Sequence, residues 1–482
     1  MDRPFDGLPR SATASSNRNQ PRPIENERLE KPHRADLEHC IHPWTDFADW
    51  KQKGSTIMVR GEGAFIEDAQ GNRYLDGMGG LWFANLGYGR QELIDAATAQ
   101  LGALPQYSYF TNIGNPPAAE LAARLADLAP GDLNHVFYST GGSAANESAV
   151  RIAHYYFDTI GQPSRRLLIS RRNAYHGSTY LTAALSGKMD EKAGFHFPQE
   201  IVHHLSEANC YRMPEGVQNE SEYRDFLARE FEEKIAELGE ENIACFFAEP
   251  IMGAGGVLMA PAGYHRRMKG ICEKHGILYI SDEVVTAFAR LGHFFASKER
   301  FDVQPDMIVV AKGITSGYIP LGATLVSDRI YEGISKPRAD GGIFSHGFTY
   351  SGHAVACAVA LANIEVMERE ELCAKVQDNG DYFLERLKSL GDLPIVGDVR
   401  GSHFMLCVEL VEDRATKKLF PDEIDVGKMV DLHAQARGLI VRPIRNLCVL
   451  SPALILDRSD IDRIVSILRE SIEATIFDLS KI

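Results

Sequence analysis

The central part of the chain alternates between short apolar runs and longer stretches of helical periodicity. In the helical stretches, such as EYRDFLAREFEEKIAEL at 222–238, apolar residues recur every three or four positions. The apolar runs show little polar alternation, which is typical of strands buried on both faces. This pattern predicts a mainly parallel sheet covered by helices on both sides. The expected strands are HVFYS (135–139), RRLLIS (165–170), IACFFAEP (243–250), ILYISDEV (277–284), MIVVAKG (307–313) and GATLVS (322–327).

The two ends of the chain differ from this central part. Residues 63–80, GAFIEDAQGNRYLDGMGG, predict a hairpin that turns at Gln70-Gly71-Asn72. After about residue 355 helical patterns dominate, and SHFMLCVELV (402–411) and GLIVRP (438–443) predict strands of a smaller α+β region. We therefore expect a flexible N-terminal arm (1–35), the first part of a small domain (36–80), a large domain (81–350) and the remainder of the small domain (351–482).

Composition narrows the possible classes of protein. The net charge of −15 argues against a general nucleic-acid-binding protein, because phosphate contacts need clustered Lys and Arg. The eight cysteines form no CxxC pair, and the histidines at 346 and 353 have no spacing typical of a zinc site, so no metal is expected. The N-terminus lacks the apolar core of a secretory signal, and no apolar stretch is long enough to span a membrane. These features predict a cytoplasmic protein.

Polar and glycine-rich segments follow several of the predicted strands: STGGSAANES, AEP, SDEV and AKG. In an open α/β sheet, ligands bind beyond the carboxyl ends of the strands. In the first segment, Gly142 and Ser143 open a helix, where free amide groups and a hydroxyl favour an anion such as a phosphate. Taken alone, the same residues fit an ordinary strand-to-helix turn with a capping serine.

Asp282 and Lys312 each end an apolar strand, thirty residues apart. A buried aspartate can hold a proton on a ring nitrogen by a charge-assisted hydrogen bond, although ion pairs and helix caps are equally common roles. A strand-end lysine is more often solvated. Desolvation favours its neutral, nucleophilic form, however, which is the form that a Schiff base requires.

Two loops add further candidates. NAYHGST (173–179) places Tyr175 where it could stack on a flat ligand, beside His176, which by itself indicates a hydrogen-bonded structural residue. SHGFTYSGHA (345–354) precedes a predicted helix, and its Thr349 could bind a phosphate oxygen. Both loops are also compatible with simple packing roles.

Together these segments resemble a known family. In chain order, the Gly-Ser pair at a helix start, Tyr-His-Gly, AEP, DEV, AKG and HGFTYSGH are similar to the class III aminotransferases, from about residue 38 to 475. GMGGLWFANLGYGR (77–90) and GLIVRPIRNLCVLSPAL (438–454) place the resemblance nearer the ω-amino acid and amine:pyruvate branch. It implies the pyridoxal 5′-phosphate (PLP)-dependent transferase fold type I, with a mainly parallel seven-stranded sheet in the large domain.

The resemblance also implies which residues carry the reaction. Lys312 matches the lysine that forms a Schiff base with PLP and moves the substrate proton. Asp282 matches the partner of the pyridine nitrogen, which keeps the ring electron-withdrawing. Glu249 matches a residue that supports the site near the cofactor hydroxyl.

The remaining cofactor contacts come from three segments. Gly142 and Ser143 match the phosphate cradle, and Thr349 matches a phosphate ligand that the other subunit donates. Tyr175 matches the aromatic residue stacked on the ring, and Val284 would pack on the opposite face. A shared phosphate site of this kind implies a homodimer, or a dimer of dimers.

Trp82 and Phe110 match aromatic residues of the substrate pocket, and Arg442 matches an arginine that binds a substrate carboxylate. A planar guanidinium suits a carboxylate, although an interface role for Arg442, or Arg445 in its place, stays open. The chain departs from the family at Ala144, where Glu is common, and at Ala354, where Pro is common.

The expected function is a transaminase that passes an amino group from an amine or ω-amino acid to pyruvate in a ping-pong reaction. Two alternatives remain at this point. A decarboxylase or an aminomutase of the same fold would use the same lysine and cofactor, and a non-catalytic PLP-binding scaffold would need only the binding residues. The retained Lys312, Asp282 and phosphate turn argue against the scaffold.

Overall fold

A computed structural model describes residues 27–338 and 340–481. The described chain divides into two compact units: one holds residues up to Arg60 together with Glu67–Asn72, and the other holds Gly61–Ile66 and the chain from Arg73 onward. In the first unit, Asp36 accepts hydrogen bonds from Ser55 and His42, and the carboxylate of Asp46 caps helix α2 (Phe47–Lys53). Helix α1 spans Glu27–His39, so part of the predicted arm is helical, and residues 1–26 of that arm lie outside the described residues.

The second unit is built on a seven-stranded sheet with the strand order β4-β10-β9-β8-β7-β5-β6. Neighbours from β9 to β6 run parallel, whereas β10 runs antiparallel to both β9 and β4. The prediction of a mainly parallel sheet is therefore confirmed. The strands are β4 (His135–Ser139), β5 (Leu167–Arg171), β6 (Val202–Leu205), β7 (Ile243–Ala248), β8 (Leu278–Asp282), β9 (Met307–Val310) and β10 (Gly322–Val326).

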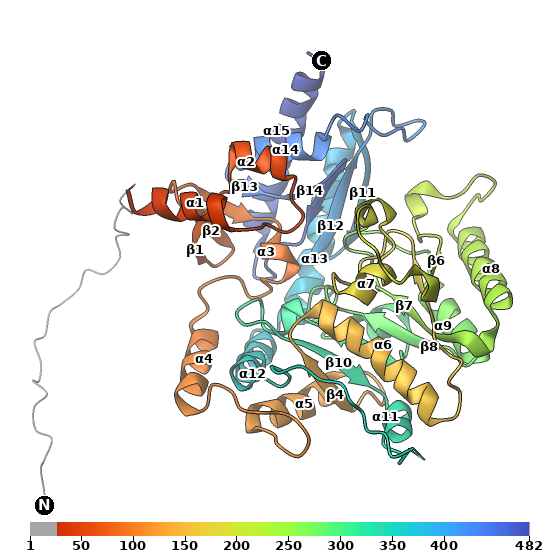
Figure 1. Ribbon diagram of the computed structural model, residues 1–482. Coiled ribbons are helices and arrows are strands. Elements are labelled where there is room, and N and C mark those ends of the chain that lie inside the picture. Colours follow the sequence, from red (N-terminus) through yellow and green to blue (C-terminus); the bar gives the residue numbers. More distant parts are fainter. Residues whose placement is uncertain (1–26, 339, 482) are drawn as a thin grey trace, which may run out of the picture. The chain divides into compact units, whose positions relative to one another are not determined.

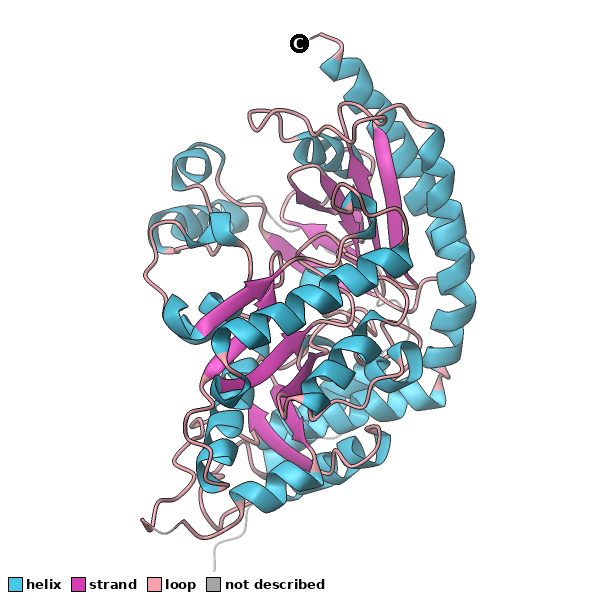
Figure 2. Ribbon diagram, turned by 90° about the vertical axis from the view of Figure 1, so that its right-hand side faces the viewer, coloured by secondary structure: helices cyan, strands magenta, loops and turns pink. Residues whose placement is uncertain are grey.

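Alternate side chains of the central strands pack on opposite faces of this sheet, as the pleat requires. Cys245 and Phe247 of β7 lie in a core cluster with helix α6 (Gly142–Thr159). Phe246, between them, lies in another cluster with helices α8 (Glu220–Leu238) and α9 (Tyr264–Lys274). Figure 1 shows α6 across one face of the strands, and in Figure 2 helices lie on both sides of them. Burial of both faces explains the continuous apolar runs in the sequence.

The C-terminal part of this unit contains a second sheet with the order β11-β12-β15-β14, in which all neighbours are antiparallel. Strand β13 pairs in parallel with β3 instead. The two strands expected around residues 70–72 are present as β2 and β3. The strands outside the large sheet are β1 (Met58–Glu62), β2 (Phe65–Asp68), β3 (Arg73–Asp76), β11 (Val396–Ser402), β12 (Met405–Leu410), β13 (Leu439–Ile440), β14 (Arg442–Ile444) and β15 (Leu447–Leu450).

Helices connect and cover these strands. Helix α12 packs on α4 and α5, and α15 packs on α13 and α14. Among the described residues, no helix is both long and apolar enough to cross a membrane. The remaining α-helices are α3 (Gly79–Trp82), α4 (Gln91–Ala103), α5 (Pro116–Leu128), α7 (Tyr180–Leu185), α10 (Ala296–Phe301), α11 (Asp328–Ile334), α12 (Ala354–Arg369), α13 (Leu372–Lys388), α14 (Val426–Gln435) and α15 (Arg458–Leu479).

Strand β6 is an element that the sequence did not predict. Its sequence, VHHL, carries two histidines in four residues and lacks an apolar run. β6 lies at the edge of the sheet, where one side of the strand has no neighbour. An edge strand needs less apolar sequence than a central one.

Candidate active site

The carboxyl ends of the sheet bring three of the predicted segments into contact. Gly142 begins α6, Val284 follows β8 and Ala311 follows β9. A Cβ atom added to Gly142 would lie 3.0 Å from Val284 Cγ1 and 3.7 Å from Ala311 Cβ. The backbone at the start of α6 therefore packs directly against the residues that adjoin Asp282 and Lys312.

Lys312 opens a short 3-10 turn, η5 (Lys312–Ile314), immediately after β9. Its φ of +49° lies in the left-handed region, which is costly for a residue with a Cβ and is maintained by the surrounding structure. Burial lowers the pKa of its amine from 10.5 to about 8, and the charges of Arg442 and Arg290 act in the same direction. The carboxylates of Asp282 and Glu249 oppose this shift. A larger share of the amine is neutral, and so nucleophilic, near pH 7 than for an ordinary lysine.

Asp282 is the last residue of β8 and is only 4% exposed. Its Oδ2 atom accepts hydrogen bonds from Asn146 Nδ2 and from His176 Nδ1, both at 2.8 Å. Its Oδ1 atom accepts one bond, from the Val284 amide at 3.1 Å. Since a carboxylate oxygen can accept two bonds, Oδ1 can accept a further donor, such as the protonated nitrogen of an aromatic ring.

Asn146 and His176 are polar neighbours of Asp282 that the sequence did not assign to the site. Both are buried, and among the described residues Asn146 Oδ1 and His176 Nε2 have no hydrogen-bond partner. The expectation that His176 is a hydrogen-bonded structural residue agrees with its bond to Asp282. No local motif indicated Asn146, whose only signal was an asparagine in the second turn of an otherwise apolar helix face.

The N-terminus of α6 is available to an anion. No side chain caps this end, and the first intrahelical bond recorded there runs from the Ala145 amide to the Gly141 carbonyl at 2.9 Å. The amides before Ala145 have no partner inside the helix, because the first turn has no preceding carbonyls. Ser143 Oγ accepts a bond from the Ser178 amide at 3.0 Å and so ties the loop of residues 173–179 to the helix start.

Glu249 follows β7 and holds the same loop from its other side. Its Oε1 atom accepts a hydrogen bond from the Tyr175 amide at 3.0 Å, and its Oε2 atom accepts one from the Gly253 amide at 2.8 Å. Burial raises the pKa of this carboxyl, and the charge of Asp282 adds to the shift. Tyr175 itself is only partly buried, and its hydroxyl lies 2.9 Å from Ser178 Oγ.

Trp82 and Arg442 both lie near Lys312. The Lys312 amine lies 6.0 Å from the centre of the Trp82 ring, which is 4% exposed and belongs to a core cluster with residues of β12 and β15. Arg442 begins β14, and its charge reaches Lys312 strongly enough to lower the pKa of the amine. Arg445, the alternative candidate, is exposed beside Asp422, with 3.8 Å between their charged atoms.

Phe110 and Thr349 lie on the surface of the chain. Phe110 is 48% exposed, and its ring approaches Gly347, two residues before the exposed Thr349. Within the part of the chain that the structure describes, neither residue forms a hydrogen bond or ring contact with Lys312 or Asp282. Within a single chain, the structure therefore brings together Lys312, Asp282, the α6 N-terminus, Tyr175, Glu249, Trp82 and Arg442, while Phe110 and Thr349 lie elsewhere.

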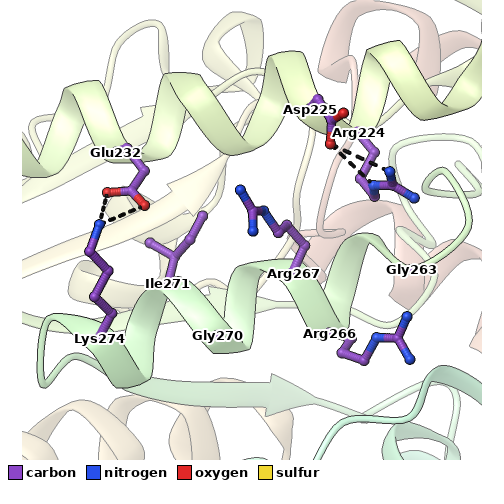
Figure 3. A pocket seen from close by; sticks show the side chains of 9 residues that line it. All are labelled: Arg224, Asp225, Glu232, Gly263, Arg266, Arg267, Gly270, Ile271 and Lys274. Atoms are coloured by element: carbon purple, nitrogen blue, oxygen red, sulfur yellow. Dashed lines mark hydrogen bonds and ion pairs between the residues drawn. The ribbon is translucent and has the colours of Figure 1, made fainter.

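A separate groove of about 590 Å³ runs between α8 and α9 (Figure 3). Lys274 pairs with Glu232 across it at 3.0 Å. No residue of the group around Lys312 lines this groove, so we place the chemistry at the strand ends. Its lining residues are Arg224, Asp225, Glu232, Gly263, Arg266, Arg267, Gly270, Ile271 and Lys274.

Comparison with known sequences identifies the family. The profile of the family described as aminotransferase class-III matches residues 47–472, which is most of the chain. The chain belongs to the class III aminotransferases. The putrescine–pyruvate aminotransferase of Pseudomonas aeruginosa is 40% identical to it over 439 residues, covering 91% of this chain and 95% of the relative.

Solved structures of class III aminotransferases share the fold. An (S)-enantioselective ω-transaminase from Thermomicrobium roseum is 42% identical, with a TM-score of 0.88, and the match covers 93% of this chain and 98% of that one. An ω-transaminase from Pseudomonas jessenii, solved in complex with PMP, is 36% identical, with a TM-score of 0.90 and coverage of 92% and 98%. These matches confirm the ω-transaminase branch and fold type I.

The cofactor of this class III aminotransferase is PLP, and the residues at the strand ends fit it. An amine of lowered pKa suits an aldehyde, and a buried carboxylate with spare acceptor capacity suits a pyridine N–H. The uncapped helix start suits a phosphate, and Gly142 packs so closely on Val284 that any Cβ at this position would require Val284 to shift. The fit rests on Lys312, Asp282 and the N-terminus of α6 together.

Proposed function

We propose that this protein transfers the amino group of an amine or ω-amino acid to pyruvate. The observation that carries the proposal is the grouping of Lys312 with Asp282 and the start of α6 at the strand ends, with the Trp82 ring centre 6.0 Å from the Lys312 amine. The charge of Arg442 also acts on this amine. A keto acid bound through its carboxylate to Arg442 would thus bring its carbonyl group towards the amine. The named activity of the Pseudomonas aeruginosa relative, which uses putrescine and pyruvate, supports this choice of substrates.

Lys312 and Asp282 have the central roles in this proposal. PLP, when bound, withdraws electrons from the carbon that carries the amino group and so makes its proton acidic. The Lys312 amine would take up that proton and deliver it to the carbon of the cofactor that carried the aldehyde, and the Asp282 carboxylate would accept the hydrogen bond of the ring nitrogen. The donor leaves as its carbonyl product before pyruvate binds, which makes the kinetics ping-pong.

The other predicted residues bind and orient the cofactor and the substrate. Gly142 and Ser143 bind the phosphate at the start of α6, and Tyr175 and Val284 lie against the two faces of the ring. Glu249 fixes the loop of Tyr175 through the hydrogen bond that it accepts from the Tyr175 backbone amide. Trp82 lines the substrate pocket of its own chain, whereas Phe110, which lies elsewhere on that chain, would line the pocket of the neighbouring subunit.

We further propose that the active enzyme is a homodimer, or a dimer of dimers, in which Thr349 binds the phosphate of the neighbouring subunit. Large apolar side chains around Thr349 are exposed in the single chain, which favours an interface there. Phe110 also meets Gly347 in this region. The exposed side chains are Tyr107 (63%), Phe110 (48%), Ile113 (39%), Ile343 (75%) and Tyr350 (57%). The cytoplasmic location and the four domain boundaries stay predictions from the sequence.

A donor panel tests the proposed reaction. The purified holoenzyme is incubated with pyruvate and, in separate assays, a diamine, β-alanine, taurine and an aryl-alkyl amine, and alanine is measured together with the carbonyl product. Equal amounts of alanine and carbonyl product with at least one donor are expected. Release of CO₂, or an isomerised product without alanine, would instead identify the decarboxylase or aminomutase of the same fold.

Arg442→Ala is expected to impair the reaction with pyruvate more than the reaction with a neutral amine. Loss of a charged hydrogen-bond partner weakens carboxylate binding by about 1.5–3 kcal/mol, or roughly 10- to 150-fold in kcat/KM for pyruvate. The isolated first half-reaction with a neutral amine should change by less than about threefold, since no carboxylate is bound. Arg445→Ala is the matched control and should leave both half-reactions intact; equal losses in both half-reactions for Arg442→Ala would remove its assigned role.

Capture of PLP by the cofactor-free protein should depend on pH in a defined way. Only the neutral amine attacks an aldehyde, and with a pKa of about 8 for Lys312 the capture rate should rise about tenfold per pH unit up to pH 7. It should level off above about pH 8, because the amine is then mostly neutral. Stopped-flow absorbance measures the rate. A rate that continues to rise tenfold per pH unit up to pH 10 would show that Lys312 has the pKa of an ordinary lysine.

A further inference from the structure

Arg290 is a completely buried arginine in the turn that follows β8. Its guanidinium donates hydrogen bonds only to neutral oxygens: the Pro452 carbonyl at 2.5 Å, Asn85 Oδ1 at 2.7 Å and the Phe404 carbonyl at 3.2 Å. Among the described residues no carboxylate lies within ion-pair distance of it, and its Nε atom has no partner. A cation buried without a carboxylate in direct ion-pair contact is costly, which points to a role beyond packing.

Asn85 connects Arg290 to the turn that carries Lys312. Its amide nitrogen donates to the Phe288 carbonyl at 2.7 Å while its oxygen accepts from Arg290. A Cβ atom added to Gly313 would lie only 2.4 Å from that amide nitrogen and 3.1 Å from Phe288 Cβ. The backbone directly after Lys312 therefore packs against Asn85, and a side chain at position 313 would force Asn85 to move.

A second asparagine holds the same turn from its other side. Asn363 of α12 donates to the Gly313 carbonyl at 2.9 Å and to the Ile314 carbonyl at 3.1 Å. Its own oxygen accepts a bond from Ser316 Oγ at 2.6 Å. The left-handed backbone of Lys312 is thus fixed between two buried side chains, of which only Asn85 is itself bound to a charged group.

We propose that Arg290 is a positioning residue for Lys312: through Asn85 it fixes the turn that carries the lysine, and it places a permanent positive charge in the same core. This inference rests on the proposed role of Lys312 as the cofactor-binding lysine. It assigns to Arg290 two separable effects, one on the geometry of the turn and one on the charge of the amine.

The charges around Lys312 make the second effect specific. Asp282 and Glu249 favour the protonated amine, whereas Arg442 and Arg290 disfavour it. Burial lowers the pKa of Arg290 itself to about 9, with the charge of Asp76 acting against the shift, so Arg290 stays protonated at neutral pH. Since Arg442 is expected to bind substrate carboxylate, Arg290 is the cation whose effect on Lys312 persists whether or not substrate is present.

The test titrates the holoenzyme and follows the absorbance of the lysine-bound cofactor against pH. A nearby positive charge disfavours protonation of the nitrogen atom that joins Lys312 to the cofactor. Arg290→Gln, which keeps a hydrogen-bonding side chain without the charge, should therefore raise the midpoint by about one pH unit. Arg290→Lys should keep the wild-type midpoint. Asn363→Leu is the matched control, because it loosens the same turn with no change in charge and should leave the midpoint in place.

Gly313→Ala tests the positioning effect with Arg290 intact, and it also covers the case in which Arg290→Gln does not fold. Its Cβ would displace Asn85 from the turn, and we expect kcat to fall about tenfold or more with little change in the KM of the donor. A wild-type midpoint in folded Arg290→Gln, an equal shift in Asn363→Leu, or wild-type kcat in Gly313→Ala would overturn the inference. A wild-type holoenzyme without a borohydride-stable label on Lys312 would overturn the proposed function instead.

Discussion

Lys312→Ala is expected to lose transamination by about 10⁴-fold or more, because in the proposed reaction this residue supplies both the covalent link to PLP and the group that moves the substrate proton. The variant should still bind PLP weakly, since Asp282 and the start of α6 remain. Alanine formed from pyruvate measures the activity. Borohydride reduction followed by peptide mapping measures the link: wild type should carry the pyridoxyl label on Lys312, and the variant should carry none.

Lys192→Ala is a suitable control for this experiment. Lys192 is also buried, with a pKa lowered by desolvation, but its amine donates to the Ala184 carbonyl at 2.8 Å. This variant should keep the label on Lys312. Activity of Lys312→Ala within tenfold of wild type, or a wild-type label on a different lysine, would contradict the assignment.

Asp282→Asn is expected to lower kcat by roughly 10²- to 10⁴-fold while the protein stays folded. Breaking a buried charged pair costs about 3–5 kcal/mol, and the proposed charged partner here is the ring nitrogen of the cofactor. The substitution also replaces an acceptor of the His176 and Asn146 hydrogen bonds with an amide. Single-turnover kinetics with a saturating donor separates the chemical step from substrate binding.

Asp306→Asn supplies the matched comparison at the opposite end of the sheet. Asp306 is buried to a similar degree and precedes β9, where it pairs with Lys269 at 2.9 Å and Arg329 at 2.7 Å. Its substitution should lower the melting temperature without changing kcat per folded molecule. If the two variants lost kcat equally, the lower kcat of Asp282→Asn would reflect reduced stability alone. That result would refute the role of Asp282 towards the cofactor.

Much of this arrangement follows from local sequence. All six strands expected in the large sheet are present, because residues buried on both faces must be apolar. The position of the site follows as well: polar residues at the ends of neighbouring parallel strands must meet at one edge of the sheet. This rule predicts that Lys312, Asp282 and Gly142 lie close together.

The sequence by itself thus determined the fold class and the family, and it predicted the residues that carry the chemistry. Only the tertiary structure decided how those residues are held: Asn146 and His176 bind Asp282, and Asn85 links Arg290 to the turn of Lys312. Asn85 and Arg290 are 205 residues apart in the chain. Contacts of this kind leave no periodic or local signal, because folding alone brings the two partners into hydrogen-bonding distance.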